Sequence, residues 1–254
     1  MELQGATALI SGGASGLGAE TAGAFVREGA RVVLFDLDER GHEVASRLGD
    51  RTRFVAGDVT SEDDVRRAIA VAEELGGRLD VAVCCAGIGG GGRALRRDGP
   101  MPLDVFTRVV TVNLIGTFNV QRLAAEAMAR EPRRGDDPDQ GVIVATASIA
   151  AFEGRIGQPA YAASKGGVVS LTLPLARELA ARRIRVATVA PGIFDTPLLG
   201  RLSDEVRADL AASVPHPKRI GDPADFARLV VHIVENPMIN GAVLRLDGAL
   251  RMAP

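Results

Sequence analysis

Short runs of apolar residues alternate with longer amphipathic stretches along almost the whole chain. Most of the short runs are apolar on both faces, which is typical of parallel strands covered by helices on both sides of a sheet. The longer stretches have the apolar spacing of helices. The predicted strands are 6–10, 31–36, 52–57, 80–86, 141–148, 184–191 and 242–248, and the predicted helices are 17–28, 39–48, 62–75, 103–130, 159–182 and 222–235.

This alternation of strand and helix predicts an α/β fold, a Rossmann-type doubly wound parallel sheet of about seven strands. The 254 residues contain no internal repeat and no linker, so we expect a single domain over 1–254. Two segments rich in Gly, Pro and charge, 87–102 and 131–140, are predicted to be surface insertions.

Composition narrows the expected partners to small molecules. The formal net charge is −2 and the arginines are mixed with acidic residues, which argues against nucleic acid and anionic membranes as partners. No stretch is long enough to span a bilayer and no leader precedes the first strand, so a cytoplasmic protein is expected. Cys84 and Cys85 are adjacent and share no metal-ligand spacing with the histidines, so neither a disulfide nor a metal site is predicted.

The first predicted strand runs into the turn "SGGASGLG", which places Gly12, Gly16 and Gly18 directly before a helix. Glycine lets the backbone approach a pyrophosphate closely, and the helix N-terminus can then bind it. The spacing differs from the common G-x-G-x-x-G fingerprint, and a plain turn would also use glycine. The position between the first strand and the first helix favours a dinucleotide.

Asp36 ends the second predicted strand. A carboxylate there can accept hydrogen bonds from ribose hydroxyls and would repel a 2′-phosphate, so NAD rather than NADP is the predicted cofactor. The alternative is that Asp36 only begins the turn "DLDER". Asp58, at the end of the third strand, is expected near the adenine.

Two rare residues lie four positions apart in "AYAASKGGVV". Tyr161 is the only tyrosine, and Lys165 is one of two lysines in a chain with 30 Lys and Arg residues. An i, i+4 pair shares a helix face, so the ammonium would lower the phenol pKa and make Tyr161 a usable acid/base. Ser148 ends the preceding strand, where open α/β sheets bind ligands, and could hold a substrate oxygen. The alternative is a solvent-facing Tyr and Lys with a turn serine.

In order along the chain, these motifs resemble those of the short-chain dehydrogenase/reductase family over essentially its whole length. The resemblance rests on "SGGASGLG", Asp36, Asp58, "CAGI", "VNLIGTF", Ser148, Tyr161 with Lys165, and "PGIFDTP". Within the family, "FEGRIGQPAYAASKGG" and "ENPMINGAVLRLDGALRM" resemble the type-2 3-hydroxyacyl-CoA dehydrogenases, which also accept hydroxysteroids. The resemblance implies NAD-dependent oxidation of a 3-hydroxyacyl-CoA. A hydroxysteroid or other apolar alcohol as substrate, and a non-catalytic NAD-binding scaffold, are the alternatives.

The resemblance also implies roles for matching residues. Tyr161 would be the general acid/base, Ser148 would orient substrate and Lys165 would bind the nicotinamide ribose. Asn113 would join a proton relay, its carbonyl holding a water beside Lys165, although by residue type alone it could be a core amide. A homotetramer through 103–130 and 159–182 is implied. Cofactor contacts are implied for Gly12, Ser15, Gly16, Leu17, Gly18, Asp36, Asp58, Val59, Cys85, Ala86, Gly87, Tyr161, Lys165, Pro191, Gly192, Ile193 and Thr196.

On the substrate side, the Gln158 amide could donate to a thioester oxygen or simply start a helix. An apolar wall is expected from Ile149, Phe152, Phe194, Leu198 and Leu199, and a cationic rim for CoA phosphates from Arg93, Arg96, Arg97 and Arg201. Two residues depart from the family pattern. Cys84 replaces an asparagine that steadies neighbouring strands, and Asp195 adds a carboxylate that would repel CoA if it faced inward.

Overall fold

The computed structural model describes residues 1–130, 139–197, 199 and 203–253. Their strands are β1 (Thr7–Ser11), β2 (Arg31–Asp36), β3 (Thr52–Ala56), β4 (Val81–Cys84), β5 (Leu95–Arg96), β6 (Gly99–Pro100), β7 (Gly141–Thr146), β8 (Ile184–Pro191) and β9 (Val243–Leu246). Their α-helices are α1 (Gly16–Arg27), α2 (Gly41–Leu48), α3 (Glu62–Gly76), α4 (Leu103–Val110), α5 (Thr117–Arg130), α6 (Pro159–Leu179), α7 (Asp204–Ser213) and α8 (Pro223–Glu235). A π-helical turn, η1 (Thr111–Gly116), joins α4 to α5, and 3₁₀ turns lie at η2 (Ile149–Ala151) and η3 (Ala180–Arg182).

Seven strands form one sheet in the order β3-β2-β1-β4-β7-β8-β9, and every pairing in it is parallel. The predicted Rossmann-type doubly wound sheet is therefore confirmed. The chain moves outward from β1 to β3 and then returns to the other side of β1 with β4. This reversal opens a crevice at the carboxyl ends of β1 and β4, which is where such sheets bind ligands.

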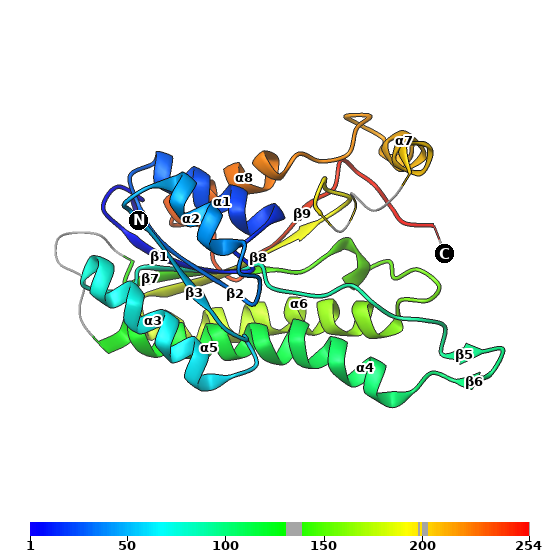
Figure 1. The fold of residues 1–254 in the computed structure, drawn as a ribbon, viewed down its shortest axis with the longest axis horizontal. Coiled ribbons are helices and arrows are strands. Elements are labelled where there is room, and N and C mark those ends of the chain that lie inside the picture. The colour runs from blue at the N-terminus through cyan, green and yellow to red at the C-terminus, as the bar shows by residue number, and fades with distance from the viewer. Residues whose placement is uncertain (131–138, 198, 200–202, 254) are drawn as a thin grey trace.

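Helices cover both faces of the sheet (Figure 1). α1, α2 and α8 lie on one face, and α3, α4, α5 and α6 lie on the other. The short antiparallel hairpin β5–β6 extends beyond the sheet from the predicted insertion 87–102. Neither this hairpin nor α7 was predicted. α7 has no buried residue, so its sequence lacks the apolar face from which a helix is recognised.

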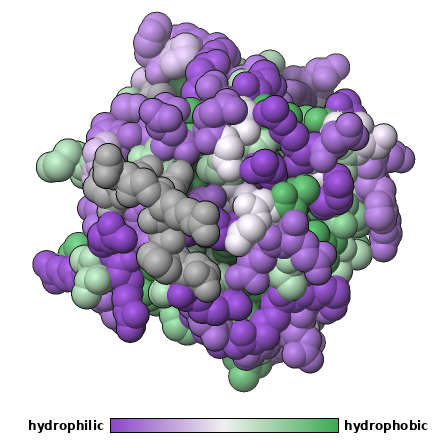
Figure 2. Space-filling model, turned by 90° about the vertical axis from the view of Figure 1, so that its left-hand side faces the viewer, coloured by the Kyte–Doolittle hydropathy of each residue, from purple (hydrophilic) through white to green (hydrophobic). Residues whose placement is uncertain are grey.

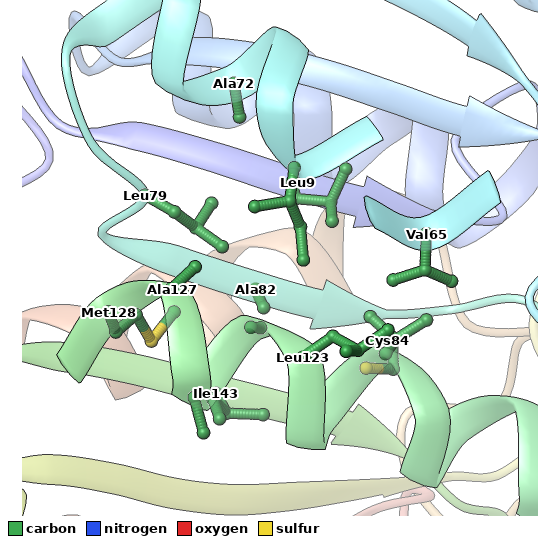
Figure 3. Packing of buried hydrophobic residues seen from close by; sticks show 14 of the residues in the cluster. Leu9, Val65, Ala72, Leu79, Ala82, Cys84, Leu123, Ala127, Met128 and Ile143 are labelled. Carbon is green, nitrogen blue, oxygen red and sulfur yellow. The ribbon is translucent and has the colours of Figure 1, made fainter. Parts of the chain in front are cut away.

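Side chains of the central strands alternate between two apolar clusters. Leu9, Ala82 and Ile143 point toward α3 and α5 (Figure 3), and all three are completely buried. Their neighbours in the strands point to the opposite cluster, which Phe25 of α1 and Phe226 of α8 complete. Both sheet faces are thus covered by helices, which explains why the strands read as continuous apolar runs.

Cys84 belongs to the first of these clusters, where it lies close to Leu123 of α5 (Figure 3). Only 2% of Cys84 is exposed, and burial raises the pKa of its thiol well above the usual range. A buried thiol behaves as a small apolar side chain. The residue in place of the family's asparagine therefore contributes to the core.

The end of the molecule opposite the β5–β6 hairpin is mostly hydrophilic, with scattered apolar residues (Figure 2). Within the described part of the chain, no helix is both long enough and apolar enough to cross a bilayer. The loops at the carboxyl ends of the strands, at the hairpin end, carry the residues considered next.

Candidate active site

The glycine turn after β1 lies against the segment that follows β4. Gly12 has φ +71°, and a Cβ atom built on it would lie 2.6 Å from the backbone N of Ala86. A Cβ atom on Gly18 would lie 2.2 Å from the carbonyl oxygen of Gly12. Only glycine fits at these two positions. The turn has no bulky side chain at the point where a pyrophosphate must come close.

The helix after this turn begins without a side-chain cap. Ser15 is the N-cap of α1, its hydroxyl accepts no capping hydrogen bond, and the first turn contains no acidic residue. The first N–H groups of a helix need an acceptor, and a phosphate supplies one. Leu17 packs against the α1–α8 side of the core, which fixes the direction of the helix. The turn and helix therefore fit a dinucleotide pyrophosphate.

Asp36 lies at the end of β2, beside the glycine turn. Its Oδ2 accepts from the N–H of Ala14 at 3.0 Å, and its Oδ1 accepts from the N–H of Asp38 at 3.1 Å. Asp58, after β3, is held in a similar way, because its Oδ1 accepts from the N–H of Thr60 at 2.8 Å. Both carboxylates thus have fixed positions along one side of the crevice. Val59 is buried, and its carbonyl accepts from Nδ2 of Asn119 at 2.8 Å.

The other predicted cofactor contacts lie at the ends of β4 and β8. Cys85 and Ala86 border Gly12. Pro191 ends β8, the N–H of Gly192 donates to the carbonyl of Leu246 at 2.9 Å, and Ile193 packs against the cluster around Ile149. A Cβ atom on Gly16, where φ is +53°, would lie 3.3 Å from Thr196 Cγ2. The segment after β8 thereby reaches the N-terminus of α1.

Ser148, Tyr161 and Lys165 come together beside this crevice. Ser148 begins the turn η2 just after β7, where its Oγ accepts from the N–H of Ala150 at 3.1 Å, and its hydroxyl acts to lower the pKa of Tyr161. Lys165 lies one helical turn further along α6, with Nζ 5.9 Å from the centre of the Tyr161 ring. Only 4% of Lys165 is exposed, and Nζ donates to the carbonyl oxygen of Thr146 at 2.8 Å.

The pKa of Tyr161 is shifted in the opposite direction from the sequence-based prediction. We expected Lys165 to lower the pKa of Tyr161, but burial raises that pKa and outweighs the opposing effect of the Ser148 hydroxyl. Burial also lowers the pKa of Lys165 to about 8. Desolvation thus disfavours the charged form of both groups, while the Lys165 ammonium is directed at the carbonyl of Thr146.

Asn113 lies in the π-helical turn and is completely buried. Its Oδ1 accepts from the N–H of Ile88 at 2.8 Å, and its Nδ2 donates to the carbonyl of Ile88 at 3.0 Å and to Ser164 Oγ at 3.1 Å. A Cβ atom on Gly87 would lie 3.2 Å from Asn113 Oδ1 and 3.5 Å from Lys165 Nζ. The Asn113 side chain therefore joins the segment after β4 to α6, next to Lys165.

The predicted substrate residues are not all brought together. Gln158 is the N-cap of α6, and its Oε1 is buried without a hydrogen-bond partner among the described residues. Leu199 is half-buried, and Leu198 lies outside the described residues, as does Arg201. Phe194 is only 8% exposed and packs edge-on against Phe226, with ring centres 6.5 Å apart. Its ring completes the core of the α1–α8 face, where we expected it to form a substrate wall.

Asp195 forms an ion pair with Arg207 of α7 at 3.0 Å. A paired carboxylate repels a substrate anion less than a lone one, because the guanidinium offsets its charge. The concern that Asp195 would exclude a phosphate-bearing substrate is thereby reduced.

Two positioning residues were missed from the sequence. Thr146 offers the carbonyl that holds Lys165, and Ser164 offers the hydroxyl that holds Asn113. Ser164 lies three residues after Tyr161, on the same side of α6, and this spacing is a signal that could have found it. Thr146 acts through its backbone, so its side chain carries no such signal.

Comparison with known proteins agrees with this geometry. The family model described as short chain dehydrogenase matches residues 6–207. The chain is 54% identical over 256 residues to 3-hydroxyacyl-CoA dehydrogenase type-2 of Bos taurus, covering 99% of this chain and 97% of the relative. It is 36% identical over 255 residues to ipsdienol dehydrogenase of Ips pini, covering 99% of each chain. The crystal structure of 3-hydroxyacyl-CoA dehydrogenase type-2 from Mycobacterium avium matches with a TM-score of 0.94 and 46% identity, covering 98% of this chain and 97% of that one.

The chain belongs to the short chain dehydrogenase family. It is an oxidoreductase that transfers a hydride between a nicotinamide cofactor and the carbon of a secondary alcohol or ketone. The predicted family and class of enzyme are both confirmed.

Proposed function

We propose that the protein oxidises (S)-3-hydroxyacyl-CoA to 3-oxoacyl-CoA with NAD. The observation that carries the chemistry is the cluster of Ser148, Tyr161 and Lys165 beside the glycine turn. The acyl-CoA substrate is supported by the relatives named 3-hydroxyacyl-CoA dehydrogenase type-2, which the chain matches over nearly its full length.

Each residue of the cluster has a role in this reaction. The Ser148 hydroxyl holds the substrate 3-oxygen, and Tyr161 Oη takes the proton of the substrate hydroxyl. The bound oxidised nicotinamide supplies the hydride acceptor and a nearby positive charge. Lys165 holds a ribose hydroxyl of the cofactor and stabilises the Tyr161 phenolate, which offsets the effect of burial on its pKa. Asn113 keeps the segment after β4 in register with α6 and joins the proton relay through its backbone carbonyl.

The decisive test is turnover of acetoacetyl-CoA with NADH, compared with steroids and simple alcohols assayed in the oxidative direction. Tyr161→Phe should keep cofactor binding and lose activity by roughly 10²–10⁴-fold, because it removes the proton-transfer group. Activity of the variant within tenfold of the wild type would remove Tyr161 from its proposed role.

The preference for NAD rests on Asp36. Two backbone N–H groups fix its carboxylate beside the glycine turn, so it would accept hydrogen bonds from the ribose and repel a 2′-phosphate. The ratio of kcat/KM for NAD to that for NADP should therefore be large and should fall in Asp36→Ala. Equal kcat/KM values for the two cofactors in the wild type would contradict the proposal.

An apolar alcohol, such as a hydroxysteroid, is the second candidate substrate. Phe152 and Ile156, which lie between Ser148 and Gln158, are 47% and 66% exposed and offer an apolar surface near the site. Turnover of a steroid without turnover of any CoA ester would favour this candidate.

We also propose a homotetramer that works in the cytoplasm. Three large apolar side chains are exposed on the helical layer formed by η1, α5 and α6, namely Ile115 (52%), Phe118 (39%) and Leu173 (45%). Contact with other copies of the chain would cover them. The two free cysteines fit a reducing compartment.

A further inference from the structure

A cavity of about 530 Å³ adjoins the first turn of α6. One wall is formed by Arg93 and Ala94, just before β5, and the other by residues 154–159 and Ala162. Gln158 and Ala162 therefore belong to the cavity wall, and the same helical turn carries Tyr161. The cavity therefore adjoins the helical turn that carries one of the catalytic residues.

The two walls are joined by their backbones. The N–H of Gly92 donates to the carbonyl oxygen of Gly157 at 2.8 Å. A Cβ atom on Gly91, where φ is +156°, would lie 2.4 Å from the same oxygen, so the close approach requires glycine. The spacing of the walls is thus set by the glycine-rich insertion, and the cavity is a built feature of the fold.

The chemistry of the cavity suits an anion. Arg93 and Arg155 both line the cavity, no Asp or Glu lines it, and neither guanidinium has a carboxylate partner among the described residues. The nearest carboxylate in sequence, Glu153, is already bound by Arg245. Two guanidiniums that line one cavity without a carboxylate partner are suited to phosphate oxygens.

A second cavity also contains arginines, but its charge is balanced. It has about 570 Å³ and lies at the start of α8, where Asp195, Asp222 and Asp225 line it together with two arginines. Asp225 pairs with both of these, Arg219 and Arg228. Its cations are already neutralised, so it does not attract an anion as the first cavity does.

We propose that the Arg93–Arg155 cavity binds the phosphate groups of a CoA ester, and that Arg155 makes the enzyme select CoA-borne thioesters over uncharged ones. The proposal rests on the acyl-CoA substrate proposed above. Arg96 and Arg97, which were expected in the cationic rim, have no part in this cavity. Neither of them lines it, and the Arg96 side chain lies over Gly92.

The test compares acetoacetyl-CoA with its N-acetylcysteamine thioester, which keeps the reacting group and lacks every phosphate. Arg155→Gln and Arg93→Gln should each raise KM for the CoA ester by roughly tenfold, as loss of one charge-assisted contact predicts, and the double variant should raise it further. The KM for the uncharged thioester should stay the same, and the dependence of the CoA-ester KM on salt should weaken. Arg47→Gln, on an exposed arginine at the end of α2, is the matched control.

Each other outcome decides against the proposal. An equal rise in KM for both thioesters would mean that the arginines shape the site without binding phosphate. A CoA-ester KM unchanged in the double variant would refute the cavity while the acyl-CoA activity stands. A wild-type enzyme that turns over steroids and neither thioester would overturn both the cavity and the proposed substrate.

Discussion

Lys165 illustrates at the residue scale how a functional group acts against stability. Its ammonium is buried, which lowers its pKa from 10.5 to about 8. Between these two values the unfolded chain holds a proton that the folded chain has lost, so stability rises with pH through that window. Relative to Lys165→Met, the wild type should gain up to about 3 kcal/mol between pH 8 and 10.5.

The measurement is urea unfolding of both proteins at several pH values across that window. Tyr161 and the arginines are common to both, so their titration largely cancels in the difference. A difference in unfolding free energy that stays constant from pH 8 to 10.5 would mean that Lys165 keeps its ordinary pKa.

Asn113 satisfies both backbone groups of Ile88. Asn113→Ala would leave those partly buried groups without their side-chain partner, so we expect a loss of roughly 1–3 kcal/mol in unfolding free energy. Asn113→Asp keeps the acceptor for the N–H of Ile88 and loses the donor to its carbonyl. Its unfolding free energy should therefore lie between those of the wild type and Asn113→Ala. A loss below about 1 kcal/mol for the alanine variant would contradict the role of the amide as a clamp.

The sequence predicted the residues whose chemistry is rare and missed those that act by packing. Tyr161 and Lys165 stand out because the chain has so few of either type, and Gly12 because it precedes a helix. Phe194 has the same apolar character whether it lines a substrate site or a core, and only the position of Phe226 decides between them. The pKa of Tyr161 depends on burial, which a four-residue spacing does not contain.

At the scale of elements, an ion-pair cluster ties the loop after β7 to β9. Arg245 of β9 binds both carboxylate oxygens of Glu153, at 2.7 and 2.9 Å, and also Asp247 at 2.7 Å. Arg251 reaches Glu153 at 3.4 Å. Because Ser148 begins the same loop, this cluster holds the segment that presents the substrate-orienting hydroxyl.

Arg245 holds the pKa of Glu153 below its ordinary value of 4.5. A depressed carboxyl pKa stabilises the fold above the ordinary pKa, and this contribution disappears as the pH falls through the folded-state value. Glu153→Gln should therefore lower Tm by a few degrees at neutral pH, and the gap to the wild type should close in acid. The control is Glu20→Gln, which removes an exposed pair with Arg27 and should change Tm little. An equal change in Tm for the two substitutions at neutral pH would mean that the ion-pair cluster does not stabilise the fold.

Elements with strong periodicity were predicted within a few residues, and the irregular ones were not. The range 103–130 reads as one helix, yet a π-helical turn divides it at the residue that contacts Ile88. A π-helical turn has backbone hydrogen bonds between residues five apart in place of four apart. The apolar pattern of the sequence does not change, so periodicity does not reveal the turn. The β5–β6 hairpin is short and exposed, and its sequence lacks the alternation of a buried strand.

At the scale of the whole molecule, the proposed tetramer makes a direct prediction. Replacing Ile115 and Phe118 together by Glu places charges on an apolar surface that a partner would bury, so the assembly should dissociate into smaller species. Sedimentation at micromolar concentration measures this. Arg47→Glu, on the α2 layer across the sheet, should leave the sedimentation coefficient unchanged. A wild-type protein that sediments as a monomer would contradict the proposed assembly.

The scarcity of tyrosine also has an optical consequence. The chain contains one tyrosine and no tryptophan, so its phenol absorption and its phenol emission both come from Tyr161. That ring lies against Ser148 and Lys165, within the reacting group. Near-ultraviolet difference spectroscopy on the unmodified protein therefore reads the ionisation of the catalytic group alone, with no signal from any other phenol or indole. Burial places this alkaline transition above the ordinary value of 10.0 in the free enzyme, and a nicotinamide bound beside the ring would register as a shift of the same spectrum.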